Sequence, residues 1–93
     1  MSVINKKRTL SGVVDHPQIN QTETISLALG TVVTGVKIVS KKTTTTQARA
    51  TIVDTLHSGR NAKIVYRGAG QIGKNFRTVI SVDISFDPII DPE

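Results

Sequence analysis

The chain has 93 residues, a length that suits one domain. It has no cysteine, which excludes disulfides and thiolate metal ligands, and no apolar run is long enough to span a membrane. Twelve Lys and Arg against seven Asp and Glu give a net charge of +5. Most acids fall after residue 82, so residues 1–82 carry twelve basic residues against Asp15, Glu23 and Asp54. Such a basic body attracts nucleic acid, anionic lipid or acidic glycan, or simply keeps a small domain soluble.

β-Branched residues make up more than a third of the chain and favour sheet. A first strand is predicted from Arg8 to Val14, with one face formed by Leu10, Gly12 and Val14. Gly12 within this strand indicates a bulge or a sharp bend. The strand ends before His16-Pro17, because proline lacks an amide donor and restricts the residue before it.

Two more strands follow in the first half. The second, Thr24 to Leu29, alternates with a period of two and places on one face Ile25, Leu27 and Leu29. The third, Thr31 to Ser40, has apolar residues on both faces, namely Val32, Val36 and Ile38 on one and Val33 and Val39 on the other. A strand that is covered on both sides has this pattern.

The segment from Gln47 to His57 is predicted to be a helix. As a strand it would place Asp54 in line with apolar residues, whereas a helix puts Ala48, Ile52 and Leu56 on one stripe. A threonine at position 45 or 46 supplies an N-cap, and Gly59 stands where a C-cap is expected.

A fourth strand is predicted from Ala62 to Arg67, and a glycine-rich connection over 68–75 leads to the last strand, Phe76 to Phe86. The last strand has one apolar face, formed by Phe76, Thr78, Ile80, Val82, Ile84 and Phe86. The order of three strands, one helix and two strands predicts a mainly β fold, a five-stranded OB-fold barrel with the helix between strands 3 and 4. We expect one domain over 1–93, with a core of about 8–86 and a loose acidic tail over 87–93.

Two nucleotide-binding motifs are approached in the glycine-rich connection. Gly68, Gly70 and Gly73 spell G-x-G-x-x-G, and Gly68, Gly73 and Lys74 nearly complete a phosphate loop. Both motifs require a helix next, whereas the following residues predict a strand, so the glycines are interpreted as turn residues with positive φ. The two histidines have no catalytic partner apart from the Asp54–His57 spacing, and no metal-ligand pattern appears. We therefore expect no enzyme activity, no cofactor and no metal.

Nucleic-acid binding is one hypothesis for the basic residues. The candidate face consists of Lys63, Arg67, Lys74 and Arg77, with the last three predicted on one hairpin. Proteins that bind single strands usually add aromatic platforms. This chain has three aromatic residues, and only Tyr66 stands outside the expected core face, although it alternates with Ile64 as a core residue would. Charge alone predicts binding that is sensitive to salt and not selective for sequence.

Two segments carry a resemblance to a known family. Residues 59–76, Gly-Arg-Asn-Ala-Lys-Ile-Val-Tyr-Arg-Gly-Ala-Gly-Gln-Ile-Gly-Lys-Asn-Phe, and residues 10–14, Leu-Ser-Gly-Val-Val, resemble the B subunits of pentameric bacterial toxins of the subtilase cytotoxin type. The resemblance implies an OB-fold homopentamer that binds cell-surface glycan and delivers a catalytic A subunit. It also implies a glycan site that includes Ser11 and Tyr66.

Three functions therefore stay open: glycan binding by a homo-oligomer, nucleic-acid binding through a basic face, and an adaptor role with a protein partner. The N-terminal residues MSVINKKRTL show no signal peptide. The protein would be secreted if such a peptide had been removed, and cytoplasmic otherwise.

Overall fold

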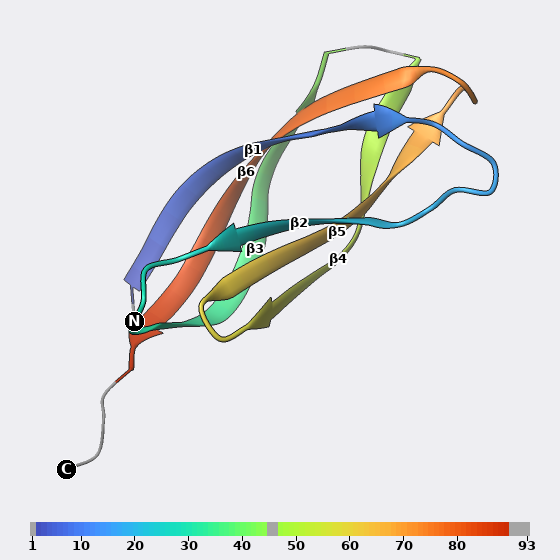
Figure 1. Ribbon diagram of the computed structural model, residues 1–93. Coiled ribbons are helices and arrows are strands. Elements are labelled where there is room, and N and C mark those ends of the chain that lie inside the picture. The colour runs from blue at the N-terminus through green and yellow to red at the C-terminus, as the bar shows by residue number, and fades with distance from the viewer. Residues whose placement is uncertain (1, 45–46, 90–93) are drawn as a thin grey trace.

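Six strands in two sheets form the molecule. The computed structural model describes residues 2–44 and 47–89. In chain order the strands are β1 (Ser2–Val13), β2 (Gln21–Ser26), β3 (Thr31–Thr43), β4 (Ala48–Ser58), β5 (Asn61–Gly70) and β6 (Asn75–Pro88). Sheet A has the strand order β1-β6-β3, sheet B has the order β2-β5-β4, and all pairs are antiparallel. The two sheets lie face to face, with the core between them (Figure 1).

The predicted OB-fold barrel is wrong. Sheet A and sheet B are separate three-stranded sheets that do not close into a barrel, and the described residues contain no helix. The first strand begins at Ser2 rather than Arg8, and it pairs along its whole length with β6. The described part of the chain accordingly has no helix that could cross a bilayer.

The predicted helix from Gln47 to His57 is a strand with a bulge. In the pairing of β4 with β5, Ile52 lies opposite Tyr66 and Asp54 lies opposite Val65, so Val53 is an extra residue. One extra residue exchanges the two faces of a strand. Ala48 and Ala50 are buried before the bulge, and Asp54 is exposed after it. The awkward alignment of Asp54 with apolar residues is therefore resolved by a bulge.

Bulges also explain the apolar residues on both faces of β3. Its pairing with β6 shifts between Val33 and Gly35 and again between Ile38 and Ser40. The first shift brings Val33, Val36 and Ile38 to the core, and the outer face of β3 stays open to solvent. A covered second face is therefore not needed. The second predicted strand is also shorter than expected at its end: β2 ends at Ser26, and Leu29 is 83% exposed instead of facing the core.

Glycine makes room for Phe76, the largest of the fully buried side chains. A Cβ at Gly12 would lie 2.9 Å from Cζ of Phe76, and a Cβ at Gly68 would lie 2.7 Å from Cε1 of the same ring. β1 pairs with β6 in an unbroken register through Gly12, so Gly12 does not mark a bulge, one of the two features that the sequence indicated there. Gly12 and Gly68 come from different sheets, and the Phe76 ring therefore fills the space that both leave.

The end of the chain agrees with the sequence in most respects. On β6, buried residues alternate as predicted, namely Phe76, Thr78, Ile80, Val82 and Ile84. Gly70, the last residue of β5, and Gly73, in the turn before β6, both have the predicted positive φ, and a strand follows the turn. The interpretation is wrong for Gly68, which lies within β5 without positive φ, because β5 continues to Gly70 and Gly68 packs against Phe76. β6 continues to Pro88, so the predicted acidic tail begins too early, and its residues 90–93 lie outside the described residues.

Candidate anion-binding face

The outer face of sheet A brings together basic residues from three strands. Lys7 of β1 and Ser40 of β3 both lie opposite Ser81 of the central strand β6. We call a residue of β6 and its partners on β1 and β3 a row of the sheet. In the next row of this face Lys42 lies opposite Val79, and the row beyond it contains Arg77. Side chains at these positions share one face because strand residues alternate with a period of two. Lys7, Lys42 and Arg77 are all exposed.

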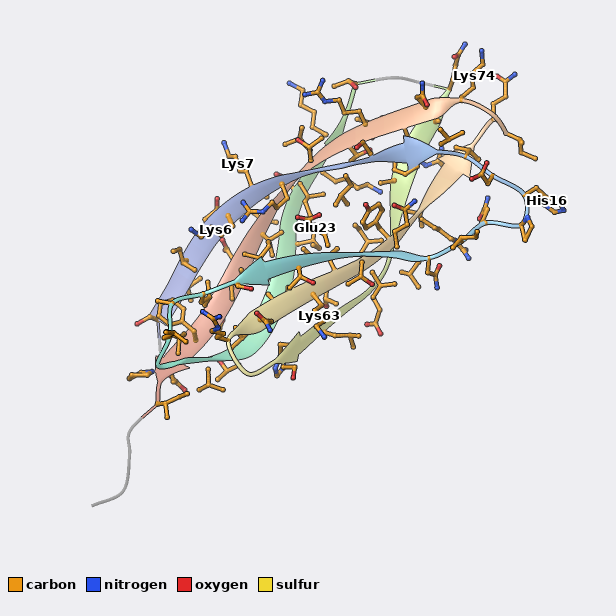
Figure 2. The ribbon with its side chains drawn as sticks, viewed as in Figure 1. Lys6, Lys7, His16, Glu23, Lys63 and Lys74 are labelled. Carbon is orange, nitrogen blue, oxygen red and sulfur yellow. The ribbon has the colours of Figure 1, made fainter. Side chains whose placement is uncertain are left out.

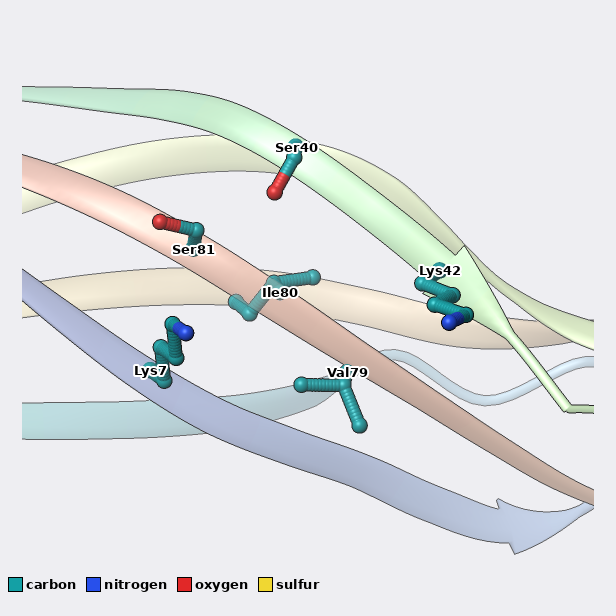
Figure 3. A pocket seen from close by; sticks show the side chains of 6 residues that line it. All are labelled: Lys7, Ser40, Lys42, Val79, Ile80 and Ser81. Atoms are coloured by element: carbon teal, nitrogen blue, oxygen red, sulfur yellow. The ribbon is translucent and has the colours of Figure 1, made fainter.

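A hollow lies in this face between the two lysines. Its volume is about 250 Å³, and its lining consists of Lys7, Ser40, Lys42, Val79, Ile80 and Ser81. Figure 3 shows Lys7 and Lys42 on either side of β6, with the hydroxyl groups of Ser40 and Ser81 on adjacent strands. The hollow thus combines two cations with two hydroxyl groups.

The second bulge of β3 sets which residues reach the hollow. Ile38 lies opposite Val82 on the inner face, Val39 is the extra residue, and Ser40 lies opposite Ser81 on the outer face. Without the extra residue in the pairing, Val39 would stand opposite Ser81 and Ser40 would turn inward. The bulge therefore replaces an apolar side chain at the hollow with a hydroxyl group.

Asn5 fixes the hydrogen bonding of Ser81. Its Nδ2 donates to Ser81 Oγ at 2.7 Å and to Asp83 Oδ1 at 2.9 Å. A serine hydroxyl has one proton and two lone pairs, so Ser81 accepts from Asn5 with a lone pair and keeps its proton for another acceptor. Within the described ranges, no protein acceptor for that proton is found.

Acidic and basic residues are separated along the outer face of sheet A. The acids of this face, Asp83 and Asp87, lie toward the C-terminal end of the strand, and Asp83 stands opposite Lys37. The three rows from Lys7 to Arg77 contain no acid among the described residues. The half of the face that holds the hollow is therefore positive.

The two residues implied as a glycan site are not brought together. Ser11 is exposed on the outer face of sheet A, opposite Arg77. Tyr66 lies on the inner face of sheet B, is 7% exposed, and packs edge-on against Phe76 with 6.4 Å between ring centroids. Its hydroxyl donates to Gln21 Oε1 at 3.3 Å. Burial, and secondarily the negative charge of Glu23, raises the pKa of the Tyr66 phenol above its ordinary value.

The four residues predicted as a nucleic-acid face are divided between the two sheets. Lys63 and Arg67 lie on the outer face of sheet B, opposite Leu56 and Thr51. Arg77 lies on the outer face of sheet A, and Lys74 lies in the connecting turn. The predicted hairpin is wrong, because β5 and β6 belong to different sheets. In Figure 2, Lys7 projects from β1 on the far side of the molecule from Lys63, and Lys74 lies at the tip.

Several residues of the face were not predicted from the sequence. Lys7 and Asn5 fall before the predicted first strand, and Ser40 and Ser81 carry no motif of their own. The only sequence signal for Asn5 and Lys7 is the alternation of Val3, Asn5 and Lys7 with Ile4 and Lys6, which becomes informative once β1 is known to start at Ser2. No group of three or more His, Asp or Glu that could hold a metal ion is found among the described residues.

The fold and this face define an all-β sandwich with a basic sheet surface. Comparisons of the chain with models of protein families, with curated proteins and with solved structures gave no match. Function is therefore inferred from the chemistry and geometry of the site itself.

Proposed function

We propose that this chain is a non-catalytic binding module that holds the phosphodiester backbone of nucleic acid on the outer face of sheet A. The observation that supports the proposal is the presence of Lys7, Lys42 and Arg77 on one outer face, where Lys7 and Lys42 line a hollow and the rows are free of acids among the described residues. Exposed cations on one face attract a polyanion and release its counterions, which provides the free energy of binding.

The position of the aromatic residues indicates how nucleic acid would be bound. Phe76 is 2% exposed and Tyr66 is 7% exposed, while Phe86 is partly buried against the core. Single-strand binders stack bases on exposed aromatic rings. No exposed ring is present in the described part of this chain, so contacts to phosphate and sugar carry the binding. We therefore expect little preference for base sequence.

The glycan hypothesis has less support from the geometry. The pentamer implied by the toxin resemblance belongs to an OB-fold barrel, which this chain does not form. Ser11 faces solvent on sheet A, whereas Tyr66 faces the core from sheet B. We therefore propose no glycan site at these two residues, and an acidic polysaccharide enters only as a competitor in the test.

The test compares two variants of equal charge. In the first, Lys7, Lys42 and Arg77 are each replaced by Gln, and in the matched control Arg49, Lys63 and Arg67 on the outer face of sheet B are each replaced by Gln. Binding of labelled single-stranded and duplex DNA and RNA is measured by fluorescence anisotropy at low salt. We expect the first variant to lose about tenfold or more in affinity and the control to lose much less.

Two results would contradict the proposal. Equal losses in both variants would show that net charge alone matters, without a specific face. Stronger binding to heparin than to any nucleic acid at the same salt concentration would assign the face to acidic glycan instead.

A further inference from the structure

We propose that the hollow on sheet A is a subsite for one phosphate group, in which Ser81 and Ser40 donate hydrogen bonds and Lys7 and Lys42 neutralise the charge. The inference rests on the proposed function and deepens it, because it assigns a position on the face to one phosphate of the backbone. It also assigns Asn5 as the residue that positions Ser81.

The direction of the Ser81 hydrogen bond is the first step. Asn5 Nδ2 is a donor, so Ser81 Oγ must be the acceptor in the 2.7 Å hydrogen bond between them. The proton of Ser81 is then directed away from Asn5. Asn5 is on β1, opposite Asp83 of β6 and one row away from the hollow. Its side-chain amide therefore approaches Ser81 from the side remote from Val79. The free proton of Ser81 is available to an acceptor over the hollow.

Ser81 is paired with a second hydroxyl group, that of Ser40. The bulge at Val39 places these two serines directly opposite each other on β6 and β3. Cβ atoms of directly opposed residues in an antiparallel pair are about 4.5–5.5 Å apart. Two hydroxyl groups at that spacing can donate to two oxygens of one tetrahedral anion. No hydrogen bond between the two serines is found in the structure, so neither hydroxyl proton is taken by the other serine.

The third step is the arrangement of charge. Lys7 of β1 lies opposite Ser81, and Lys42 of β3 lies opposite Val79. The two ammonium groups therefore approach the hollow from opposite sides of β6 (Figure 3). Asp83 is the nearest acid on β6, and its carboxylate accepts from Asn5. Donors therefore surround the hollow, and an oxyanion is the ligand that satisfies them.

The arrangement of the donors in the hollow favours phosphate over carboxylate. The hydroxyl and ammonium groups come from three strands and donate hydrogen bonds from different directions. A tetrahedral anion accepts from several directions and therefore suits this arrangement better than a planar carboxylate. A phosphodiester has two free oxygens for the serines, and its two ester oxygens continue the chain along the face toward Arg77. The subsite thus fits a phosphate within a backbone as well as free phosphate.

The experiment is an NMR titration of the full chain with inorganic phosphate and with a thymidine dinucleotide. Ser81→Ala is compared with Ser85→Ala, a change on the same face of the same strand, four residues away. We expect the largest amide shifts at residues 40–42 and 79–81. We also expect the dissociation constant for phosphate to rise about three- to tenfold in Ser81→Ala and to be unchanged in Ser85→Ala. Thermal melting of both variants checks that they are folded.

Asn5 is tested through its coupling to Ser81. Asn5→Ala should weaken phosphate binding, and Asn5→Ala combined with Ser81→Ala should bind no worse than Ser81→Ala alone, because Asn5 acts through that hydroxyl. A purely structural role of Asn5 would instead give additive losses, which would overturn its assignment.

The remaining outcomes separate this inference from the proposed function. Equal phosphate affinity in Ser81→Ala and Ser85→Ala would overturn the subsite, while loss of DNA binding in the Lys7, Lys42 and Arg77 variant would still support the function. Phosphate binding at Ser81 without any binding of DNA or RNA would support a small-anion site and overturn the nucleic-acid function.

Discussion

The packing of Phe76 depends on two residues that have no side chain. Gly12 from sheet A and Gly68 from sheet B both approach this ring, and a Cβ at either position would come within 3 Å of it. Phe76 is 2% exposed and cannot move outward without leaving the core. Protein interiors are packed too densely to absorb such a contact without strain.

We therefore predict that Gly68→Ala destabilises the fold by about 1–3 kcal/mol, the usual effect of overpacking a core. Urea unfolding followed by circular dichroism measures the change. Gly35→Ala is the control, because its Cβ would meet Ser85 Cβ at an ordinary 3.7 Å and its φ is not positive. A loss at Gly35 equal to that at Gly68 would show that the Phe76 contact is not the cause.

Tyr66 predicts a dependence of stability on alkaline pH. In the folded state, burial and secondarily the charge of Glu23 raise its pKa above the ordinary value of 10.0. As the pH rises past that value, the unfolded chain releases the phenolic proton before the folded chain does. The contribution of Tyr66 to stability is therefore complete below pH 10 and is lost as the pH rises through the folded pKa.

The variant Tyr66→Phe isolates this contribution. We expect its free energy of unfolding to fall less steeply above pH 10 than that of the parent chain, as measured by urea unfolding in steps of pH. Because Tyr66 is the single tyrosine, phenolate absorbance reports its ionisation directly. Identical pH profiles for the two chains would show that Tyr66 is not linked to folding.

At the scale of elements, polar side chains close the two long sides of the sandwich. Between β1 and β2, Arg8 Nε lies 3.7 Å from Glu23 Oε1, and Figure 2 shows Glu23 between these strands. Between β3 and β4, Lys41 Nζ donates to the carbonyl of Ala50 at 3.0 Å. Between β6 and β4, Thr78 Oγ1 accepts from the amide of Ala50 at 3.1 Å. Backbone groups at the edge of β4 are thus satisfied by sheet A, which also protects an edge strand from foreign pairing.

Thr78 is the buried part of this closure, and we predict that Thr78→Val costs about 1–3 kcal/mol, because the Ala50 amide loses its acceptor while it stays buried. Thr78→Ser keeps the hydroxyl and should cost clearly less. Hydrogen exchange of the Ala50 amide provides a second measurement, with faster exchange expected in Thr78→Val alone. Equal stability of the valine and serine variants would contradict this role.

Bulges decided which elements were predictable from the sequence. β6 was predicted with its core face because every register shift lies in its partners, so its alternation continues through the whole strand. The extra residues are in β3 and β4, where they interrupt the period of two. In β4 the interruption at Val53 imitated a helical stripe. A local pattern cannot distinguish these cases, because a bulge is stabilised by contacts with the partner strand.

At the scale of the whole molecule, the candidate site depends on pairing between the two ends of the chain. Lys7 and Ser81 are neighbours through the β1–β6 ladder, and Ser40 joins them from the middle of the sequence. The basic excess was visible in the composition, but its distribution was not. Lys63 and Arg67 proved to lie on one sheet and Arg77 on the other, because the chain crosses between sheets after β5. Strand order is a long-range property that alternation does not encode.

Because the basic residues are divided between two opposite faces, we can predict which of them determine how DNA binding depends on salt concentration. If Lys7, Lys42 and Arg77 contact three phosphates of duplex DNA, the logarithm of the binding constant should fall with the logarithm of salt concentration with a slope of about −2.7. Replacing the three residues by Gln should remove most of that slope, whereas replacing Arg49, Lys63 and Arg67 should leave it nearly unchanged, although both variants lose the same charge. Anisotropy titrations at four salt concentrations measure the slopes. Counterion release depends on the phosphates in contact and not on the net charge of the protein, so equal slopes in the two variants would mean that sheet A is not the contact face.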